Sequence, residues 1–428
     1  MDSKQRTASL DSVLTALGIP ESAPIIAPYW ERSMASLPED IPPFLAPESI
    51  SQMRSLARLP QEADSVLHSL ARQITVSQTL LQFAWHCQLL LCEYLDYDIA
   101  MIRQWPELNA ALGKNAGAFY LLIGLAAIPR IRAIHQKKEI PETISIDTCG
   151  RHYPETVGRY RDHHDGLFGV KPGALYWLRN YIRGDLYRLG RLEYMLKPFG
   201  GRLRAFRHQH TRAVIALAAD GSAFDEEGLA TQPDTSDAWR AKLIEQNGTI
   251  SGYPIAPHGY ARPQQITLSL DEWQPALSPG DTILDVHIPS GGHMTLASCR
   301  ESMQQALNFF PRYFPTAHCA GFACGSWILN PQLAQIYRPD SNIVLWQREL
   351  YLYPIPSGDL SGLVFVFGKD EIDLKTAPRD TSLRRALLDH MAVGGRLIGG
   401  GMFILREDFA HFGAQRYHQH WRQYGDEQ

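Results

Sequence analysis

The stretch from 281 to 330 constrains the fold of this chain more than any other. It reads as a strand (282–288), a loop of small residues (289–292), a helix (295–313) and a second strand (320–329). Apolar residues recur at helical spacing within the helix, so we expect it to pack on a sheet; they are Leu296, Met303, Leu307 and Phe310. A strand, a crossover helix and a second strand therefore form the predicted centre of the fold.

The loop before this helix has the composition of an anion-binding cradle. Gly291 and Gly292 allow backbone N–H groups to turn toward a ligand. A helix N-terminus adds unsatisfied donors and partial positive charge, and Thr295 is a suitable N-cap residue. The pattern predicts that a phosphate-containing ligand binds here. A purely structural turn is the alternative, because the loop has neither a Walker lysine nor Rossmann glycine spacing.

Composition sets the broad class of the protein. Hydrophobic residues make up 45% of the 428 residues and charged residues 20%, which is the balance of a soluble protein with a sizeable core. A net charge of −4 gives no electrostatic case for a nucleic-acid partner. The six cysteines form no C-x-x-C pair and the chain begins without an apolar signal region, so we expect reduced thiols and a cytoplasmic location. The apolar run at 116–128 is shorter than the about 20 residues of a membrane span and predicts a buried helix.

The first 140 residues read as a helical domain. Segment 62–76 carries Leu67, Leu70 and Ile74 on one face, and segment 77–105 is apolar on nearly every side, as in a helix buried within a bundle. The side chains of His86, Cys87 and Cys92 on that segment are interpreted as core packing. Residues 141–189 are also helical but more polar, and we assign them to the second domain.

After Leu189 the apolar period changes from helical to two, which indicates strands. Gly200 and Gly201 suggest a hairpin that leads into a strand at 202–208. The polar segment 229–263 reads as a surface loop or lid. Further strands are predicted at 266–270, 343–353, 363–368 and 402–406, with a short helical turn at 271–273 and helices at 331–337 and 381–393.

Mixed hairpin and crossover connections favour an α+β fold over a doubly wound parallel sheet. We therefore predict two domains: an all-α N-terminal domain over 1–140, and a mixed-sheet domain over 141–428. His208 and His210 would share one face of a strand, but no third ligand at metal-binding spacing accompanies them, so no metal is expected.

From Leu189 onward the order of elements resembles that of a GNAT-type N-acyltransferase. More specifically, the chain resembles a bacterial acyltransferase family in which a helical N-acyltransferase domain precedes a GNAT-like C-terminal domain. The matching segments are LDEW (270–273), PGD (279–281), VHIPSGG (286–292), CRES (299–302), ALNFF (306–310), FP (314–315), CGSWILNP (324–331) and SNI (341–343).

The resemblance implies an acyl-CoA site, with acetyl-CoA or another acyl-CoA as co-substrate. In the GNAT fold the central strand splays from its neighbour, the pantetheine arm lies in the gap, and the pyrophosphate rests on backbone N–H groups before the next helix. Carried onto this chain, the cofactor-binding residues are Ser290, Gly291, Gly292, His293, Met294 and Thr295. The usual Gln/Arg-x-x-Gly-x-Gly/Ala pattern of that loop is absent here.

Acyl transfer to an amine requires a proton acceptor and a donor for the departing thiolate. His287, at the end of the central strand, is the predicted general base, and its alternative role is to cap the strand. Cys324 and Ser326 on the next strand are candidates to face the thioester or the acceptor, but no His-Asn partner is visible for a covalent cysteine mechanism, so buried packing is the favoured interpretation of Cys324. Tyr337 occupies the position where some GNAT enzymes place a tyrosine acid.

Two classes of function remain open from the sequence. The first is an acyl-CoA-dependent N-acyltransferase whose acceptor is a small-molecule or peptide amine, with neither nucleic acid nor membrane as a partner. The second is a non-catalytic protein that keeps the GNAT fold to bind acyl-CoA or another metabolite. A nucleotide-binding role for the loop is disfavoured because the phosphate-binding lysine is missing.

Overall fold

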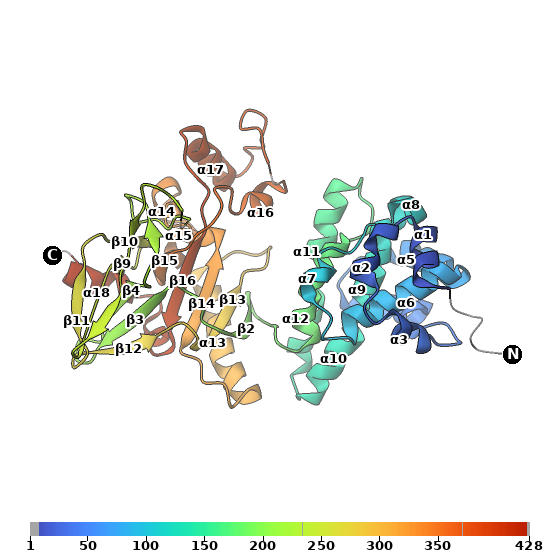
Figure 1. The fold of residues 1–428 in the computed structure, drawn as a ribbon, viewed down its shortest axis with the longest axis horizontal. Helices are drawn as coiled ribbons and strands as arrows, with labels where there is room; N and C mark the ends of the chain where they lie inside the picture. Colours follow the sequence, from blue (N-terminus) through green and yellow to red (C-terminus); the bar gives the residue numbers. More distant parts are fainter. Residues whose placement is uncertain (1–7, 233, 370, 426–428) are drawn as a thin grey trace. The chain divides into compact units, whose positions relative to one another are not determined.

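The computed structural model describes residues 8–232, 234–369 and 371–425, and its contacts divide the chain into two units, 1–189 and 190–428. The first unit is helical, and the second combines sheets with helices (Figure 1). The predicted α+β fold class, with an all-α N-terminal part, is therefore confirmed.

The helical unit is a bundle built around α6 and α9. Its helices are α1 (Leu10–Leu17), α2 (Ala23–Ile26), α3 (Trp30–Ala35), α4 (Pro47–Leu56), α5 (Ala63–Val76), α6 (Gln78–Cys92), α7 (Ile99–Ile102), α8 (Asn109–Leu112), α9 (Ala116–Leu125), α10 (Ala127–Lys137), α11 (Glu142–His163) and α12 (Leu178–Ile182). Short 3-10 turns join them at Pro20–Ser22, Pro43–Leu45, Gly113–Asn115 and Pro172–Trp177, and β1 (Tyr187–Leu189) closes the unit.

Local sequence explains where these helices begin and what they bury. The side chain of Ser77 caps α6 by accepting from the backbone N–H of Leu80. Every residue of α9 is buried, so the predicted core helix is confirmed. Segment Asn109–Lys137 is apolar and long enough to cross a membrane, but 72% of its most apolar window is buried inside the protein, as expected for a core helix of a bundle.

A buried arginine attaches the last helix of this unit to α6. The Arg179 guanidinium of α12 is 0% exposed and donates to the carbonyl oxygens of Leu90, Leu91, Tyr94 and Tyr97. These carbonyls lie at and beyond the C-terminal end of α6, where a helix lacks intrahelical donors. The unit therefore extends to Leu189, whereas the sequence placed the boundary after residue 140, between α10 and α11.

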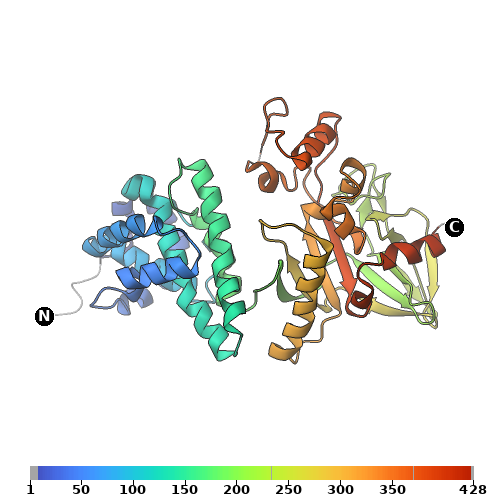
Figure 2. The same cartoon turned by 180° about the vertical axis from the view of Figure 1, so that it is seen from behind.

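The second unit is organised around a mixed sheet with the order β2-β13-β14-β16-β15. These strands are β2 (Leu192–Pro198), β13 (Thr282–His287), β14 (Gly321–Ser326), β16 (Gly400–Leu405) and β15 (Tyr351–Pro354). Helix α13 (Leu296–Tyr313) connects β13 to β14, which are parallel, and Figure 2 shows it lying along one face of this sheet. The strand, helix and strand predicted from 282 to 329 are confirmed, with the last three residues forming a 3-10 turn.

An antiparallel sheet of order β10-β9-β4-β3-β12 and smaller strand pairs complete the β structure. These strands are β3 (Leu203–His208), β4 (Val214–Ala218), β5 (Ala223–Phe224), β6 (Trp239–Arg240), β7 (Ile244–Gln246), β8 (Thr249–Gly252), β9 (Pro254–Ala256), β10 (Tyr260–Ala261), β11 (Ile266–Ser269) and β12 (Trp273–Leu277). The Tyr351 hydroxyl joins the two larger sheets, since it donates to the Ile255 carbonyl and accepts from the Ala216 amide.

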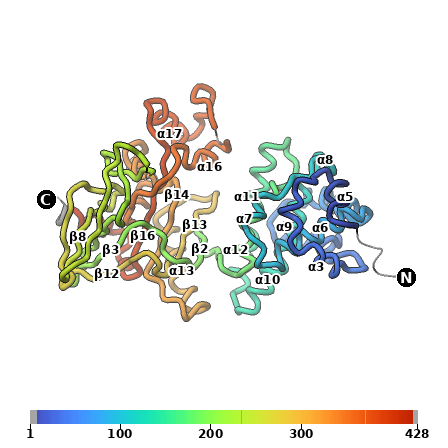
Figure 3. Tube along the Cα trace, viewed as in Figure 1, coloured from blue at the N-terminus to red at the C-terminus, as the bar shows by residue number. Residues whose placement is uncertain are grey.

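The remaining helices follow β14 along the chain. They are α14 (Leu333–Ile336), α15 (Asn342–Gln347), α16 (Leu363–Phe367), α17 (Ser382–Ala392) and α18 (Arg416–Gly425). The segment with α16 and α17 projects beyond one end of the central sheet (Figure 3). It has its own small core, formed by Leu333, Leu363, Phe367, Leu387, Leu388 and Leu397.

Several sequence predictions for the second unit are wrong. The hairpin at Gly200 does not form, because β2 pairs with β13 and β3 pairs with β4, so the glycines carry the chain between sheets. Residues 229–263 are not a loop but hold β6 to β10, whose strands are too short to show a period. The apolar runs at 363–367 and 342–347 are helices, since short apolar runs do not distinguish a helix from a strand. Trp273 begins β12 rather than ending a helical turn.

Candidate active site

The central sheet opens between its two parallel strands. β13 and β14 pair only at Leu284 with Phe322 and at Asp285 with Ala323. Beyond these positions β13 still pairs with β2 as far as His287, and β14 still pairs with β16 as far as Ser326. The two central strands therefore diverge at their C-terminal ends, as the resemblance implied, and leave a gap in the middle of the sheet.

The glycine loop lies directly after β13 and before α13. Gly291 has φ 76° and Gly292 has φ 77°, the left-handed region that residues other than glycine adopt at a cost. Arg191 donates to the Pro289 carbonyl at 2.9 Å and so fixes the start of the loop. The exposed residues 290–293 leave the loop backbone accessible to a ligand.

The N-terminus of α13 is capped as the sequence predicted. The Thr295 hydroxyl accepts from the Ser298 amide at 3.1 Å, and Met294 is buried just before it. Because α13 is 18 residues long, its dipole places partial positive charge beside the loop. The loop and helix start together have the geometry of an anion-binding site.

His287 lies beside two charged residues on one face of the sheet. Its Nε2 is 3.1 Å from Oδ2 of Asp285, and the same oxygen is 2.7 Å from Nζ of Lys197. Burial alone would raise the pKa of Asp285, but the hydrogen bonds from His287 and Lys197 outweigh it and lower that pKa. Asp285 is therefore a carboxylate at neutral pH and holds the His287 ring in place.

Cys324 and Ser326 lie on the opposite face of the sheet from His287. Side chains alternate along a strand, and Asp285 is in register with Ala323, so the face that carries Asp285 and His287 also carries Gly325. Burial raises the pKa of the Cys324 thiol, which keeps the thiol protonated and unreactive. This geometry favours packing as the role of Cys324.

Tyr337 follows α14 and is attached to α17. Its hydroxyl shares a hydrogen bond with the Ser382 hydroxyl at 2.9 Å, and Ser382 is the first residue of α17. The Tyr337 hydroxyl is therefore bonded to the start of α17, and its role as a catalytic acid stays a prediction.

Sequence reasoning overlooked the partners of His287. Asp285 precedes it by two residues on the same strand, and Lys197 and Glu193 lie on β2, where Glu193 is in register with His287 and is buried. The Asp-x-His spacing within a predicted strand was a usable signal, because such residues share a face. The β2 residues carried no such signal, since the pairing of β2 with β13 is long-range.

No metal-binding group accompanies these residues. Among 8–232, 234–369 and 371–425, the His, Cys, Asp and Glu side chains form no cluster of three that could hold a metal ion.

Comparison with known proteins agrees with this fold. Residues 48–184 match the family model of the N-acyltransferase N-terminal domain, and residues 186–403 match that of the GNAT-like C-terminal domain. No curated protein matches the chain.

Solved structures of acyltransferases share the fold. One in complex with decanoyl-CoA and teicoplanin is 21% identical, with a TM-score of 0.64 over 92% of this chain and 98% of that one. An acyltransferase mutant in complex with octanoyl-CoA is 20% identical, with a TM-score of 0.63 over the same shares.

The divergent strands, the glycine loop and the helix that follows it define the class of protein as a GNAT-like acyltransferase. This chain belongs to the acyltransferase family that joins an N-acyltransferase N-terminal domain to a GNAT-like C-terminal domain. The non-catalytic alternative is thereby left without support.

Proposed function

We propose that this protein is an acyl-CoA-dependent N-acyltransferase that transfers an acyl group to an amine by direct attack on the thioester. The gap between β13 and β14 carries the proposal, because a glycine loop lies at its mouth and the Asp285–His287 pair lies on its wall. β13 ends at His287, the proposed proton acceptor, and the proposed anion-binding loop follows directly after it.

The donor is proposed to bind along the gap. Its pyrophosphate would lie on the backbone N–H groups of residues 290–295, where the α13 dipole favours negative charge. The pantetheine arm would extend between the diverging strands, past Gly325. A Cβ at Gly325 would meet only the Ile355 side chain, at 3.6 Å, so this glycine keeps the wall of the gap open.

His287 is proposed to accept the proton of the amine. Nε2 lies 3.1 Å from the Asp285 carboxylate. In the proposed mechanism this carboxylate favours the tautomer with the N–H on Nε2, and Nδ1 accepts the proton. The amine nitrogen attacks the thioester carbon, its proton passes to Nδ1, and the C–S bond of the tetrahedral intermediate breaks. The products are an amide and the thiol of CoA, which takes up one proton as it leaves.

The acyl chain and acceptor are proposed from the solved relatives. Their complexes with decanoyl-CoA and octanoyl-CoA suggest that a medium-chain acyl-CoA is a better donor than acetyl-CoA. The complex with teicoplanin suggests an amine on a peptide-like small molecule as acceptor.

The test combines turnover with a variant of the loop. The protein is incubated with octanoyl-CoA or acetyl-CoA and a panel of amines, and the release of free CoA thiol is followed. Gly292→Trp is expected to weaken CoA binding at least about tenfold, because a bulky side chain would occupy the space above the loop.

Gly292→Asn is the matched control, since asparagine tolerates positive φ better than other residues and adds little bulk. Unchanged CoA affinity in Gly292→Trp would overturn the assignment of the loop. CoA binding without release of thiol for any amine would instead overturn the proposed transfer.

A further inference from the structure

Arg191 lies beside the glycine loop although it comes from a distant part of the chain. It directly precedes β2, and its Nη1 donates to the Pro289 carbonyl at 2.9 Å. The two residues are 98 positions apart. They meet because β2 pairs antiparallel with β13, with Glu193 opposite His287 at the last paired position. This strand pairing therefore places a cationic side chain next to the loop that follows β13.

The Arg191 side chain is close to both the loop and the first turn of α13. A Cβ placed on Gly292 would lie 3.8 Å from Cδ and from Nε of Arg191, which is ordinary van der Waals contact. Burial raises the pKa of the Cys299 thiol, in the first turn of α13, to about 11, and the charge of Arg191 acts against this rise. Arg191 is half-buried, so water screens its charge less than that of a fully exposed side chain.

The loop has no cationic side chain of its own that is permanently charged. Residues 288–295 include neither lysine nor arginine. The N-terminus of α13 supplies only about half an elementary positive charge, and the backbone N–H groups of the loop are neutral donors. The pyrophosphate of an acyl-CoA carries a negative charge on each phosphate, so a guanidinium beside the loop would supply charge that the loop backbone lacks.

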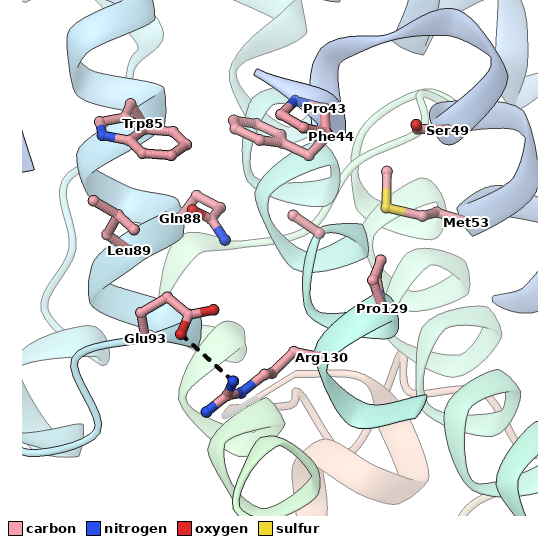
Figure 4. Close-up of a pocket in the computed structure, with 11 residues that line it drawn as sticks. Pro43, Phe44, Ser49, Met53, Trp85, Gln88, Leu89, Glu93, Pro129 and Arg130 are labelled. Atoms are coloured by element: carbon pink, nitrogen blue, oxygen red, sulfur yellow. Dashed lines mark ion pairs between the residues drawn. The ribbon is translucent and has the colours of Figure 1, made fainter. Parts of the chain in front are cut away.

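The pocket of the helical unit offers no comparable charge. It has a volume of about 530 Å³ and a mainly apolar wall (Figure 4). Its two charged lining residues, Glu93 and Arg130, balance each other, with Oε2 of Glu93 3.7 Å from Nη1 of Arg130. A pyrophosphate would meet the Glu93 carboxylate there, whereas residues 288–295 include no acidic side chain. The loop and Arg191 therefore match a pyrophosphate better than this pocket does.

We propose that Arg191 binds the donor, with its guanidinium on the pyrophosphate of the acyl-CoA while the same group lies on the backbone N–H groups of the loop. A guanidinium has five N–H donors in a planar fork, and the hydrogen bond to Pro289 uses one of them. This inference rests on the proposed function, because its ligand is the donor of that reaction. It gives the start of β2 a part in donor binding.

The test is calorimetric titration of the full chain and of Arg191→Met with octanoyl-CoA, octanoyl-3′-dephospho-CoA and octanoyl-pantetheine. Methionine keeps an unbranched side chain beside Gly292 but removes the charge. Arg191→Met should weaken binding of both pyrophosphate-containing ligands by the same factor, about ten- to a hundredfold, as loss of a hydrogen bond to a charged group predicts. Binding of octanoyl-pantetheine, which has no phosphate, should not change.

Two further variants serve as controls. Arg191→Lys should recover part of the lost affinity, because it restores the charge without the planar fork. Arg312→Met makes the same change of net charge at an exposed position in the last turn of α13, and it should leave every affinity unchanged. The difference between Arg191→Met and the parent protein should shrink as the salt concentration rises.

Three outcomes would overturn the inference. A loss of affinity for octanoyl-CoA but not for its dephospho form would place Arg191 at the 3′-phosphate instead. An equal loss for octanoyl-pantetheine would make Arg191 a structural support of the loop. Unchanged affinities in Arg191→Met, together with weakened CoA binding in Gly292→Trp, would remove Arg191 from the site and leave the proposed function intact. A parent protein that binds none of the three ligands would overturn the proposed function as well.

Discussion

Two histidines, one in each unit of this protein, have contrasting surroundings. His86 in the helical unit is 0% exposed, with its ring nitrogens 2.7 Å from the Ser33 hydroxyl and the Ile26 carbonyl. His287 in the GNAT-like unit has a side chain that is 22% exposed and lies 3.1 Å from a carboxylate. Burial among uncharged groups makes a histidine structural, whereas partial exposure beside an ionised partner suits it to proton transfer.

Replacing His287 should give the largest effect. His287→Ala is expected to lower kcat by roughly a hundred- to ten-thousand-fold, the range for loss of a general base, with little change in CoA affinity. Steady-state rates and a CoA titration measure the two quantities. His210→Ala, an exposed histidine in the same unit, is the control and should keep full activity. An active His287→Ala enzyme would remove the proton-transfer role from this residue.

Acidification should destabilise the helical unit through His86. Burial lowers the pKa of His86 to about 4, and this effect outweighs the hydrogen bond to the Ile26 carbonyl, which alone would raise the pKa. As the pH falls from 6.5 to 4, the unfolded chain binds a proton that the folded chain does not, so the free energy of unfolding decreases.

The loss that His86 contributes is roughly 3 kcal/mol over that pH range. Urea unfolding of the full chain at several pH values measures it. His86→Gln should show a shallower dependence on pH than the parent protein, although it is less stable at pH 7. Identical slopes in the two proteins would contradict the assignment to His86.

Neutralising Asp285 should have a smaller effect than removing His287. Asp285→Asn preserves the shape of the side chain but no longer fixes the N–H of His287 on Nε2 as a carboxylate does. We expect kcat to fall by roughly ten- to a hundred-fold, below the general-base range. Asp285→Glu is expected to recover part of the lost activity, and an unaffected kcat in Asp285→Asn would show that the ion pair has no positioning role.

Replacing Lys197 should change kcat least. Its side chain is 46% exposed, and an exposed ion pair contributes about 0–1 kcal/mol. Lys197→Met should therefore change kcat by at most about fivefold and should become indistinguishable from the parent enzyme at high salt. A loss as large as that of Asp285→Asn would mean that Lys197 contacts the substrate.

The sequence by itself determined the elements whose signals are local. The strand, glycine loop and helix from 282 to 313 were predicted because a capping threonine, two glycines and a helical apolar period all lie within 32 residues. The buried helices of the first unit were predicted for the same reason, since α9 is apolar on every side. The predicted position of His287 at the end of that strand is confirmed, and its role as the base stays a prediction.

Only the tertiary structure decided which strands pair and which side chains meet. β2 pairs with β13, far from it in the sequence, and this pairing brings Lys197 and Glu193 to the face of His287. The register of β13 with β14 placed Cys324 and Ser326 on the face opposite His287. No local pattern reveals this, because a shift of the register by one residue would turn every side chain of the strand to the other face. Arg179, whose hydrogen bonds join α12 to α6 across more than 80 residues, fixed the extent of the helical unit in the same way.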